Sequence, residues 1–339
     1  MGQPPASGST MSTTTTVTES TSSSAFNLTL RSRRLCSKAE ITTVGISPAN
    51  SAAFAIYTGG QTAQSWVDVF DLNSQRGYCK TSGSDATFDP QGNRIATVRD
   101  WTVQLAGGVE YHHNTTVLLR DATTGKTGRT NGELKQASGS PVAWNSDGKL
   151  LAAAEGQDRM GIWDTRTGVR VGRVMSHIDT ITHAVFMPDN SLVTVSRDGT
   201  LRITNVATAK TLRRLEMGNE SSANPRGLSV SPDGRRIVSI WGSTVHVWLP
   251  RTNDLTSYGL NSVRCNEGWP LCISADCRLV ACRTEDGFDV MDVDSGEVVL
   301  ARDDDVAVTA AVFAVDGKTL VLGKMDGHVE VWDVLNSKA

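Results

Sequence analysis

From about residue 26 onward, short apolar segments alternate with polar turns in a pattern that repeats along the chain. Each repeat holds an apolar strand, a turn with Pro or Asp-Gly, and a second strand. Equivalent positions of these turns fall at residues 49, 91, 147, 189, 233, 276 and 316, with intervals of 42, 56, 42, 44, 43 and 40 residues. This spacing predicts seven repeats of about 45 residues, the length of one four-stranded propeller blade.

A third strand follows each turn and ends in Trp-Asp or a related pair, as at residues 162–164 and 331–333. One four-stranded sheet buries too little apolar surface to be stable alone, so neighbouring sheets are expected to stack in a ring. The pattern therefore predicts an all-β fold, a seven-bladed β-propeller of four-stranded antiparallel blades. The long second interval is explained by an insertion at residues 100–115, between the second and third strands of blade 2.

The two ends of the propeller are expected to meet. The last repeat stops soon after residues 331–333, which leaves no segment for its outer strand. Residues 26–35 alternate apolar Leu28 and Leu30 with polar Thr29 and Arg31, as a half-buried strand does. We predict that this segment completes the last blade and closes the ring, because closure removes exposed sheet edges.

The Trp-Asp pairs, together with His177 and the run 196–200 (Ser-Arg-Asp-Gly-Thr), resemble the signature of the WD-repeat β-propeller family. The resemblance covers about residue 26 to the C-terminus. A typical blade of that family links a His, a Ser or Thr, an Asp and a Trp by hydrogen bonds. The resemblance assigns three of these places in blade 4 to His177, Ser196 and Asp198, with Thr204 in place of the Trp. Since no blade holds all four, we expect apolar stacking to matter more than this network.

Composition places limits on the function. Residues 1–25 contain 14 Ser or Thr and one charged residue, which predicts a disordered tail before the propeller of residues 26–339. The chain has 33 Lys and Arg against 36 Asp and Glu, a balance that argues against charge-driven nucleic-acid binding. The sequence shows no apolar run of membrane-spanning length and no export signal. We therefore expect a cytoplasmic protein, with the nucleus as the alternative, and reduced cysteines.

Few residues of the sequence suggest catalysis or metal binding. Four cysteines, Cys265, Cys272, Cys277 and Cys282, have spacings that zinc could accept, but two of them occupy strand positions that are apolar in other repeats. They are better explained as buried apolar side chains. We expect no catalytic residue, metal or cofactor. A propeller hydrolase is the distant alternative, and it requires carboxylates or arginines that converge in the central channel.

The family resemblance implies that the loops after the second and fourth strands of each blade form one face of the ring. On this face we predict a scaffold or adaptor site for proteins or peptides on a protein that is itself monomeric. The candidate binding residues precede the turns of blades 4 to 7 or lie in the blade 2 insertion: Arg197, Trp241, Glu285, Met325, Trp101 and Tyr111. We expect Trp241 to be exposed, since Trp and Arg are enriched at binding hot spots. The alternative for Trp241 is packing against a neighbouring blade.

A second motif predicts a different partner on the opposite face. Trp163, Asp164 and Arg166 follow an apolar run at residues 150–154. Together they resemble the box by which some WD-repeat proteins dock to the adaptor of cullin-4-type ubiquitin ligases. The resemblance assigns the docking role to Arg166. The alternative function is therefore that of a substrate receptor of such a ligase.

Overall fold

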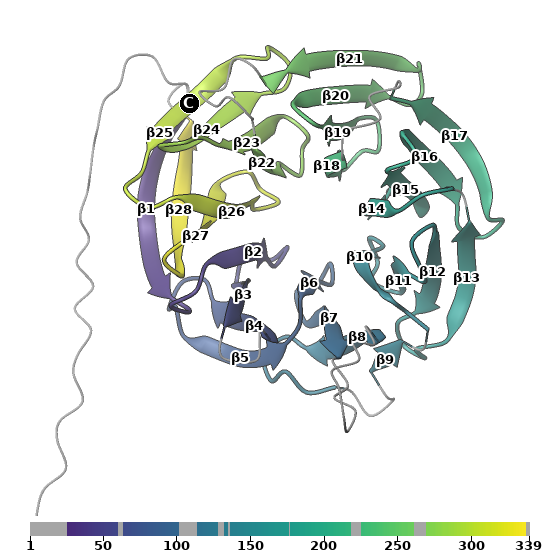
Figure 1. Cartoon of the computed structure of the whole chain (residues 1–339), viewed down its shortest axis with the longest axis horizontal. Helices are drawn as coiled ribbons and strands as arrows, with labels where there is room; N and C mark the ends of the chain where they lie inside the picture. The colour runs from purple at the N-terminus through teal and green to yellow at the C-terminus, as the bar shows by residue number, and fades with distance from the viewer. Residues whose placement is uncertain are drawn as a thin grey trace, which may run out of the picture.

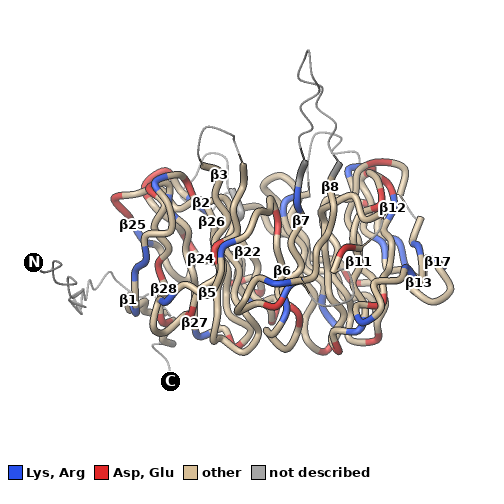
Figure 2. Tube along the Cα trace, turned by 90° about the horizontal axis from the view of Figure 1, so that it is seen from below, with Lys and Arg blue, Asp and Glu red and all other residues tan. Residues whose placement is uncertain are grey.

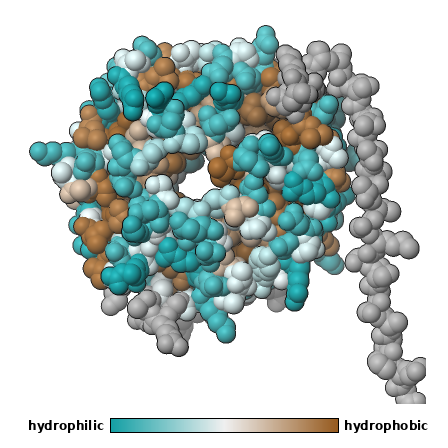
Figure 3. Space-filling view, turned by 180° about the vertical axis from the view of Figure 1, so that it is seen from behind, coloured by the Kyte–Doolittle hydropathy of each residue, from teal (hydrophilic) through white to brown (hydrophobic). Residues whose placement is uncertain are grey.

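The computed structural model describes residues 26–59, 64–101, 114–127, 132–134, 136–175, 177–217, 225–260 and 269–336. These residues form seven four-stranded antiparallel sheets and no helix, so none of them belongs to a helix that could span a membrane. The sheets stand around a ring (Figure 1), and the surface is open at its centre (Figure 3). The predicted seven-bladed β-propeller is confirmed. The predicted disordered tail, residues 1–25, lies outside the described part of the chain.

Strands are named a to d from the centre of the ring outward, and blade 1 begins at β2. The a strands are β2 (Ile41–Ile46), β6 (Asp85–Phe88), β10 (Gly139–Trp144), β14 (Ile181–Phe186), β18 (Pro225–Val230), β22 (Trp269–Ile273) and β26 (Val308–Phe313). The b strands are β3 (Ala52–Gly59), β7 (Arg94–Trp101), β11 (Leu150–Ala154), β15 (Ser191–Ser196), β19 (Ile237–Trp241), β23 (Leu279–Arg283) and β27 (Thr319–Lys324).

The c strands are β4 (Gln64–Asp71), β8 (Asn114–Asp121), β12 (Arg159–Asp164), β16 (Thr200–Asn205), β20 (Thr244–Leu249), β24 (Gly287–Asp292) and β28 (His328–Asn336). The d strands are β5 (Gly77–Ser82), β9 (Glu133–Leu134), β13 (Arg170–Met175), β17 (Lys210–Glu216), β21 (Asp254–Gly259), β25 (Val298–Asp303) and β1 (Phe26–Leu35). Because strands alternate in direction, the b–c and d–a loops lie on one face, here called the b–c face. The a–b and c–d loops lie on the other, the a–b face.

The core lies between the blades. Trp163 of blade 3 is fully buried in a cluster with Val98 and Val117 of blade 2. In the same way Trp332 of blade 7 packs with Phe288 of blade 6. The b strands are rich in β-branched and small apolar residues, which fit a sheet covered on both faces. Each blade is thus stabilised mainly by its two neighbours.

The ring closes through the start of the chain, as predicted. Strand β1 pairs antiparallel with β28, from Phe26 opposite Asn336 to Leu35 opposite His328. Its side chains alternate between half-buried and exposed, and Leu28 and Leu30 pack against the cluster between blades 6 and 7. The outer edge of β28 is therefore covered by a strand about 300 residues away in sequence.

The repeated turns on the a–b face have a local cause. In a–b turns a side chain caps the backbone, as where Asn145 Oδ1 accepts a hydrogen bond from the amide of Leu150 at 2.8 Å. In c–d turns the aspartate that ends strand c does the same, as where Asp71 Oδ1 accepts from the amide of Ser74 at 2.6 Å. A hydrogen bond from Tyr78, with others from Ser74, lowers the pKa of Asp71 to about 2. These aspartates are structural, because their carboxylates are used within their own turns.

Candidate protein-binding face

Three of the predicted binding residues are exposed on the b–c face. Arg197, Glu285 and Met325 all lie in b–c turns, and Met325 is 47% exposed. Two of these turns are fixed to the preceding d–a loop by a backbone hydrogen bond. The amide of Arg197 donates to the carbonyl of Thr180 at 2.9 Å, and that of Met325 to Ala307 at 3.0 Å. The ring therefore holds these side chains in defined positions.

The predicted exposure of Trp241 is wrong. Trp241 is 3% exposed, and it packs in a cluster with β15 and β16 of blade 4. Its indole N–H donates to Ser239 Oγ at 3.2 Å. Strand pairing makes Trp241 equivalent to Ser196, the last residue of β15, rather than to Arg197. An offset of one residue turns a strand side chain to the opposite face of the sheet, which is why the alternative, packing against a neighbouring blade, is found.

The side chains of two further predicted residues, Trp101 and Tyr111, are not among those that the structure describes. The backbone of Trp101 ends β7, but its side chain lies outside the described residues. Tyr111 and the rest of the enlarged b–c connection, residues 102–113, also lie outside them. Their role in binding remains a prediction.

In blade 4 a buried polar network joins the d–a loop to the b–c turn. His177 Nδ1 lies 2.9 Å from Asp198 Oδ2, and His177 Nε2 lies 2.7 Å from Thr194 Oγ1. The strand b partner of His177 is Thr194 and not the assigned Ser196, whose Oγ contacts the network only by accepting a hydrogen bond from the amide of Asp198 at 3.1 Å. Thr194 lies two residues before Ser196 and so points to the same side of β15. Ser196 Oγ instead donates to the carbonyl of Asp179 at 2.9 Å.

The charge states of this network follow from its burial. Burial lowers the pKa of His177 below its ordinary value of 6.5, although Asp198 opposes the shift. Burial alone would raise the pKa of Asp198, but hydrogen bonds from Thr200 and His177 hold it below its ordinary value. A neutral imidazole donates from Nδ1 to the carboxylate and accepts from Thr194 at Nε2. Both ring nitrogens are thus occupied, and the network fixes the loop instead of offering a base.

Blade 7 joins the same two loops with charges. Lys324 is fully buried and forms ion pairs with Asp304 and with Glu330, whose Oε2 lies 3.3 Å from the Lys324 ammonium. The indole of Trp332 donates to the same Glu330 oxygen at 3.1 Å. Arg33 of β1 adds a third contact, with Nε 3.4 Å from Glu330 Oε1. Closure of the ring and fixation of this loop therefore share one network.

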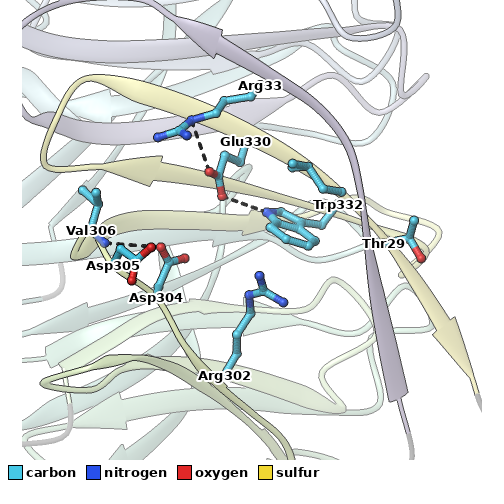
Figure 4. Close-up of a pocket in the computed structure, with 9 residues that line it drawn as sticks. Thr29, Arg33, Arg302, Asp304, Asp305, Val306, Glu330 and Trp332 are labelled. Carbon is cyan, nitrogen blue, oxygen red and sulfur yellow. Dashed lines mark hydrogen bonds and ion pairs between the residues drawn. The ribbon is translucent and has the colours of Figure 1, made fainter. Parts of the chain in front are cut away.

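Beside this network a cavity of about 290 Å³ lies between blades 6 and 7 (Figure 4). Its wall combines Arg33 of β1, Arg302 of β25, Trp332 of β28, and Asp304 and Asp305 of the d–a loop. The Arg302 guanidinium lies 4.2 Å from the centre of the Trp332 ring. Within the described residues, Arg302 Nε has no hydrogen-bond partner.

The sequence contains a partial signal for this cavity, a basic run at residues 31–34 and an acidic run at residues 303–305. The structure brings Arg33, Asp304 and Asp305 of these runs to one cavity. The ion pairs themselves differ, because Arg33 pairs with Asp326 and Glu330. In the sequence, the buried Lys324 is only one charged residue at the end of an apolar strand. Its partners Asp304 and Glu330 come from two separate segments of the chain.

Comparisons with known proteins agree with this geometry. The family described as "WD domain, G-beta repeat" matches residues 168–205, which run from β13 to the end of β16 and include the blade 4 network. This match and the seven-bladed ring support a WD-repeat family for the chain. "Periodic tryptophan protein 2" of Arabidopsis thaliana is 25% identical to it over 204 residues, which is 57% of this chain. The match spans only 22% of that relative's length.

The second predicted motif lies on the a–b face, in blade 3. Trp163 is fully buried, and Asp164 Oδ1 accepts hydrogen bonds from the amides of Arg166 at 3.0 Å and Thr167 at 2.7 Å. Arg166 itself is exposed. Of the three residues, only Arg166 presents a free side chain on the surface, and its docking role remains a prediction.

The remaining candidate residues lie in blade 6 and on the a strands of the ring. Cys277 and Cys282 are fully buried, and burial raises the pKa of Cys272 to about 12 and of Cys277 to about 11. Thiols of such high pKa are poor nucleophiles. Cys265 lies outside the described residues, among which no His, Cys, Asp or Glu cluster suited to a metal occurs. The seven a strands carry one carboxylate, Asp85, and one arginine, Arg226, so the convergence that a hydrolase requires is not found on them.

Proposed function

We propose that this protein is a non-catalytic scaffold that binds partner proteins or peptides on its b–c face. The observation that carries the proposal is the exposure of Arg197, Glu285 and Met325 on turns that belong to a closed ring. Met and Arg are enriched at protein interfaces relative to the rest of the surface. WD-repeat propellers generally serve as interaction scaffolds, which supports the same function.

Physical chemistry favours this face as a preformed surface. The turns of Arg197 and Met325 are anchored through their backbone amides, and blades 4 and 7 each add a buried polar network beneath them. A surface that is ordered before binding loses little conformational entropy when the partner docks. The polar and charged groups of these networks are already paired within the ring, which favours a structural over a catalytic role.

Affinity capture with two matched variants tests the proposal. The first variant carries Arg197→Ala, Glu285→Ala and Met325→Ala on the b–c face. The control carries Arg251→Ala, Lys318→Ala and Val315→Ala, which are exposed on the a–b face. Exposed substitutions of this kind change stability by within about 0.5 kcal/mol each, so both variants are expected to fold.

Partners identified by mass spectrometry with the wild-type chain are expected to be lost with the first variant and retained with the control. Recovery of the same partners with both variants would show that the b–c face is not the docking surface. If the wild-type chain captures nothing above a mock bait, the scaffold function itself is contradicted.

A further inference from the structure

The cavity between blades 6 and 7 is bounded by segments from both ends of the chain. Its walls come from β1, β25, β28 and the loop that joins β25 to β26. Its volume of about 290 Å³ is at the small end of the range typical of ligand pockets, about 300–1,000 Å³. A ligand that fits this cavity therefore has the size of a small metabolite.

Arg302 brings a cationic group into this cavity without an anionic partner. Its guanidinium stacks on the ring of Trp332, 4.2 Å from the ring centre, and within the described residues it forms no ion pair. Its Nε is enclosed, but its two terminal nitrogens are not, and in Figure 4 they point into the space between Trp332 and the d–a loop. Two such nitrogens match the two oxygens of a carboxylate.

One carboxylate of the cavity wall is also available. Asp304 and Glu330 both pair with the buried ammonium of Lys324. Asp305 is exposed at the cavity, and in the described part of the chain it has no cationic partner. The cavity thus presents one available group of each sign, Arg302 and Asp305, which do not pair with each other.

The charges around the cavity balance, with three cations and three carboxylates: Arg33, Arg302, Lys324, Asp304, Asp305 and Glu330. Figure 2 shows both signs of charge around β1 and β25. A phosphate or a dicarboxylate would meet three carboxylates and one available guanidinium. A zwitterion adds no net charge and can use both available groups. Leu30, Val306 and Trp332 complete the wall with apolar surface, which suits an apolar side chain.

We propose that this cavity binds a free α-amino acid with an apolar side chain. The terminal nitrogens of Arg302 donate hydrogen bonds to the α-carboxylate, and the carboxylate of Asp305 accepts them from the α-ammonium. The apolar side chain lies against Leu30 and Val306. Because β1 and β28 both contribute to the wall, the bound amino acid also stabilises the closed ring. The inference goes beyond the proposed scaffold function and does not depend on it.

The test is isothermal titration calorimetry of the purified full-length chain with L-valine, L-leucine and L-phenylalanine at millimolar concentration. The amino acid that binds most tightly is then compared with its two analogues that lack one charge. For leucine these are 4-methylpentanoate, which lacks the α-ammonium, and 3-methylbutylamine, which lacks the α-carboxylate. Each analogue is expected to bind at least about tenfold more weakly, because a charge-assisted hydrogen bond is lost. Inorganic phosphate serves as a further probe.

Two variants assign the groups. Arg302→Gln and Asp305→Asn are each expected to weaken binding of the amino acid by about tenfold or more. Their matched controls, Arg251→Gln and Asp316→Asn, make the same changes in charge at exposed positions of the a–b end and should bind like the wild type. In Arg302→Gln, the analogue without a carboxylate should bind as well as the amino acid itself, because the partner of that carboxylate is gone.

Circular dichroism melts check that the variants are folded, and an amino acid that binds should raise the wild-type unfolding temperature. If Arg302→Gln fails to fold, the two analogues on the wild-type chain decide the question alone. The proposal is overturned if none of the three amino acids binds, or if an analogue binds as tightly as its parent. Unchanged affinity in a folded Arg302→Gln variant, or tighter binding of phosphate, would overturn it as well.

Discussion

Blades 4 and 7 solve the same structural problem with different chemistry. Each must fix a b–c turn to the d–a loop beside it. Blade 4 uses a neutral His177 between Asp198 and Thr194, all supplied by one stretch of about 20 residues. Blade 7 uses buried Lys324, with carboxylates from the loop after β25 and from β28, and Arg33 from the start of the chain.

The difference separates a blade formed by one continuous stretch of chain from the blade that closes the ring. The blade 4 network is local in sequence, so it can form as soon as its own strands pair. The blade 7 network requires that β1 has already returned to β28, because Arg33 is part of it. Buried charges carry a desolvation cost, so such a network gives no large net stability, but it penalises any arrangement in which a partner is missing. We interpret it as a device that favours the closed ring.

Removal of residues 26–35 should have the largest effect, because blade 7 then loses its outer strand, Arg33 and the packing of Leu28 and Leu30. We expect loss of the cooperative unfolding transition in urea or on heating, followed by circular dichroism. A chain that lacks only residues 1–25 is the control and should unfold like the full chain. An unchanged transition after removal of β1 would show that blade 7 is no more dependent on distant residues than blade 4.

Lys324→Met should cause the second largest loss of stability. It leaves Asp304 without its buried cation, and breaking a buried ion pair in this way costs about 3–5 kcal/mol of unfolding free energy. Addition of Asp304→Asn should recover about 1 kcal/mol or more, because the uncompensated charge is then removed. Urea unfolding curves measure both values. A double variant no more stable than Lys324→Met would show that Asp304 does not contribute to the network.

The smallest effect concerns the pH dependence of blade 4. The pKa of folded His177 lies below its ordinary 6.5, so on acidification the unfolded chain takes up this proton first. Stability is therefore full above pH 6.5 and declines as the pH falls below it. At pH 5.5 the loss is at most about 1.4 kcal/mol. The lowered pKa of Asp198 gives a loss of the same sign, but below its ordinary value of 3.8.

His177→Gln isolates this contribution. The change in unfolding free energy between pH 7.5 and pH 5.5 should be smaller in the variant than in the wild type. His183, whose pKa burial lowers to about 4, contributes the same dependence to both proteins and cancels in the comparison. An equal pH dependence in the two proteins would mean that His177 is not held neutral by burial.

The architecture could be predicted from the sequence because it depends on local, repeated features. Strand periodicity, turn residues and their spacing fix one blade, and seven similar blades can only stack. The missing last strand and the alternating segment 26–35 even indicated how the ring closes. Each of these features can be recognised in a short window of residues, without knowledge of what lies opposite.

The positions of the side chains in the candidate site could not be predicted from short windows of sequence. Trp241 was misplaced because the b–c turn of blade 5 is shorter, and one residue of offset decides between solvent and core. Thr194 was passed over for Ser196 for a related reason, since both lie on the same side of β15 and only the position of the His177 ring distinguishes them.

The sequence alone thus determined the number of blades, their strand order and the closing segment, because those follow from periodicity and from edges that must be covered. The tertiary structure alone decided the Lys324 network and the cavity at Arg302. These features arise where three segments come together: β1, β28, and the loop that follows β25. No repeat in the sequence indicates that these segments are neighbours. Charge and burial at such a point are properties of neighbours in space, which no single segment specifies.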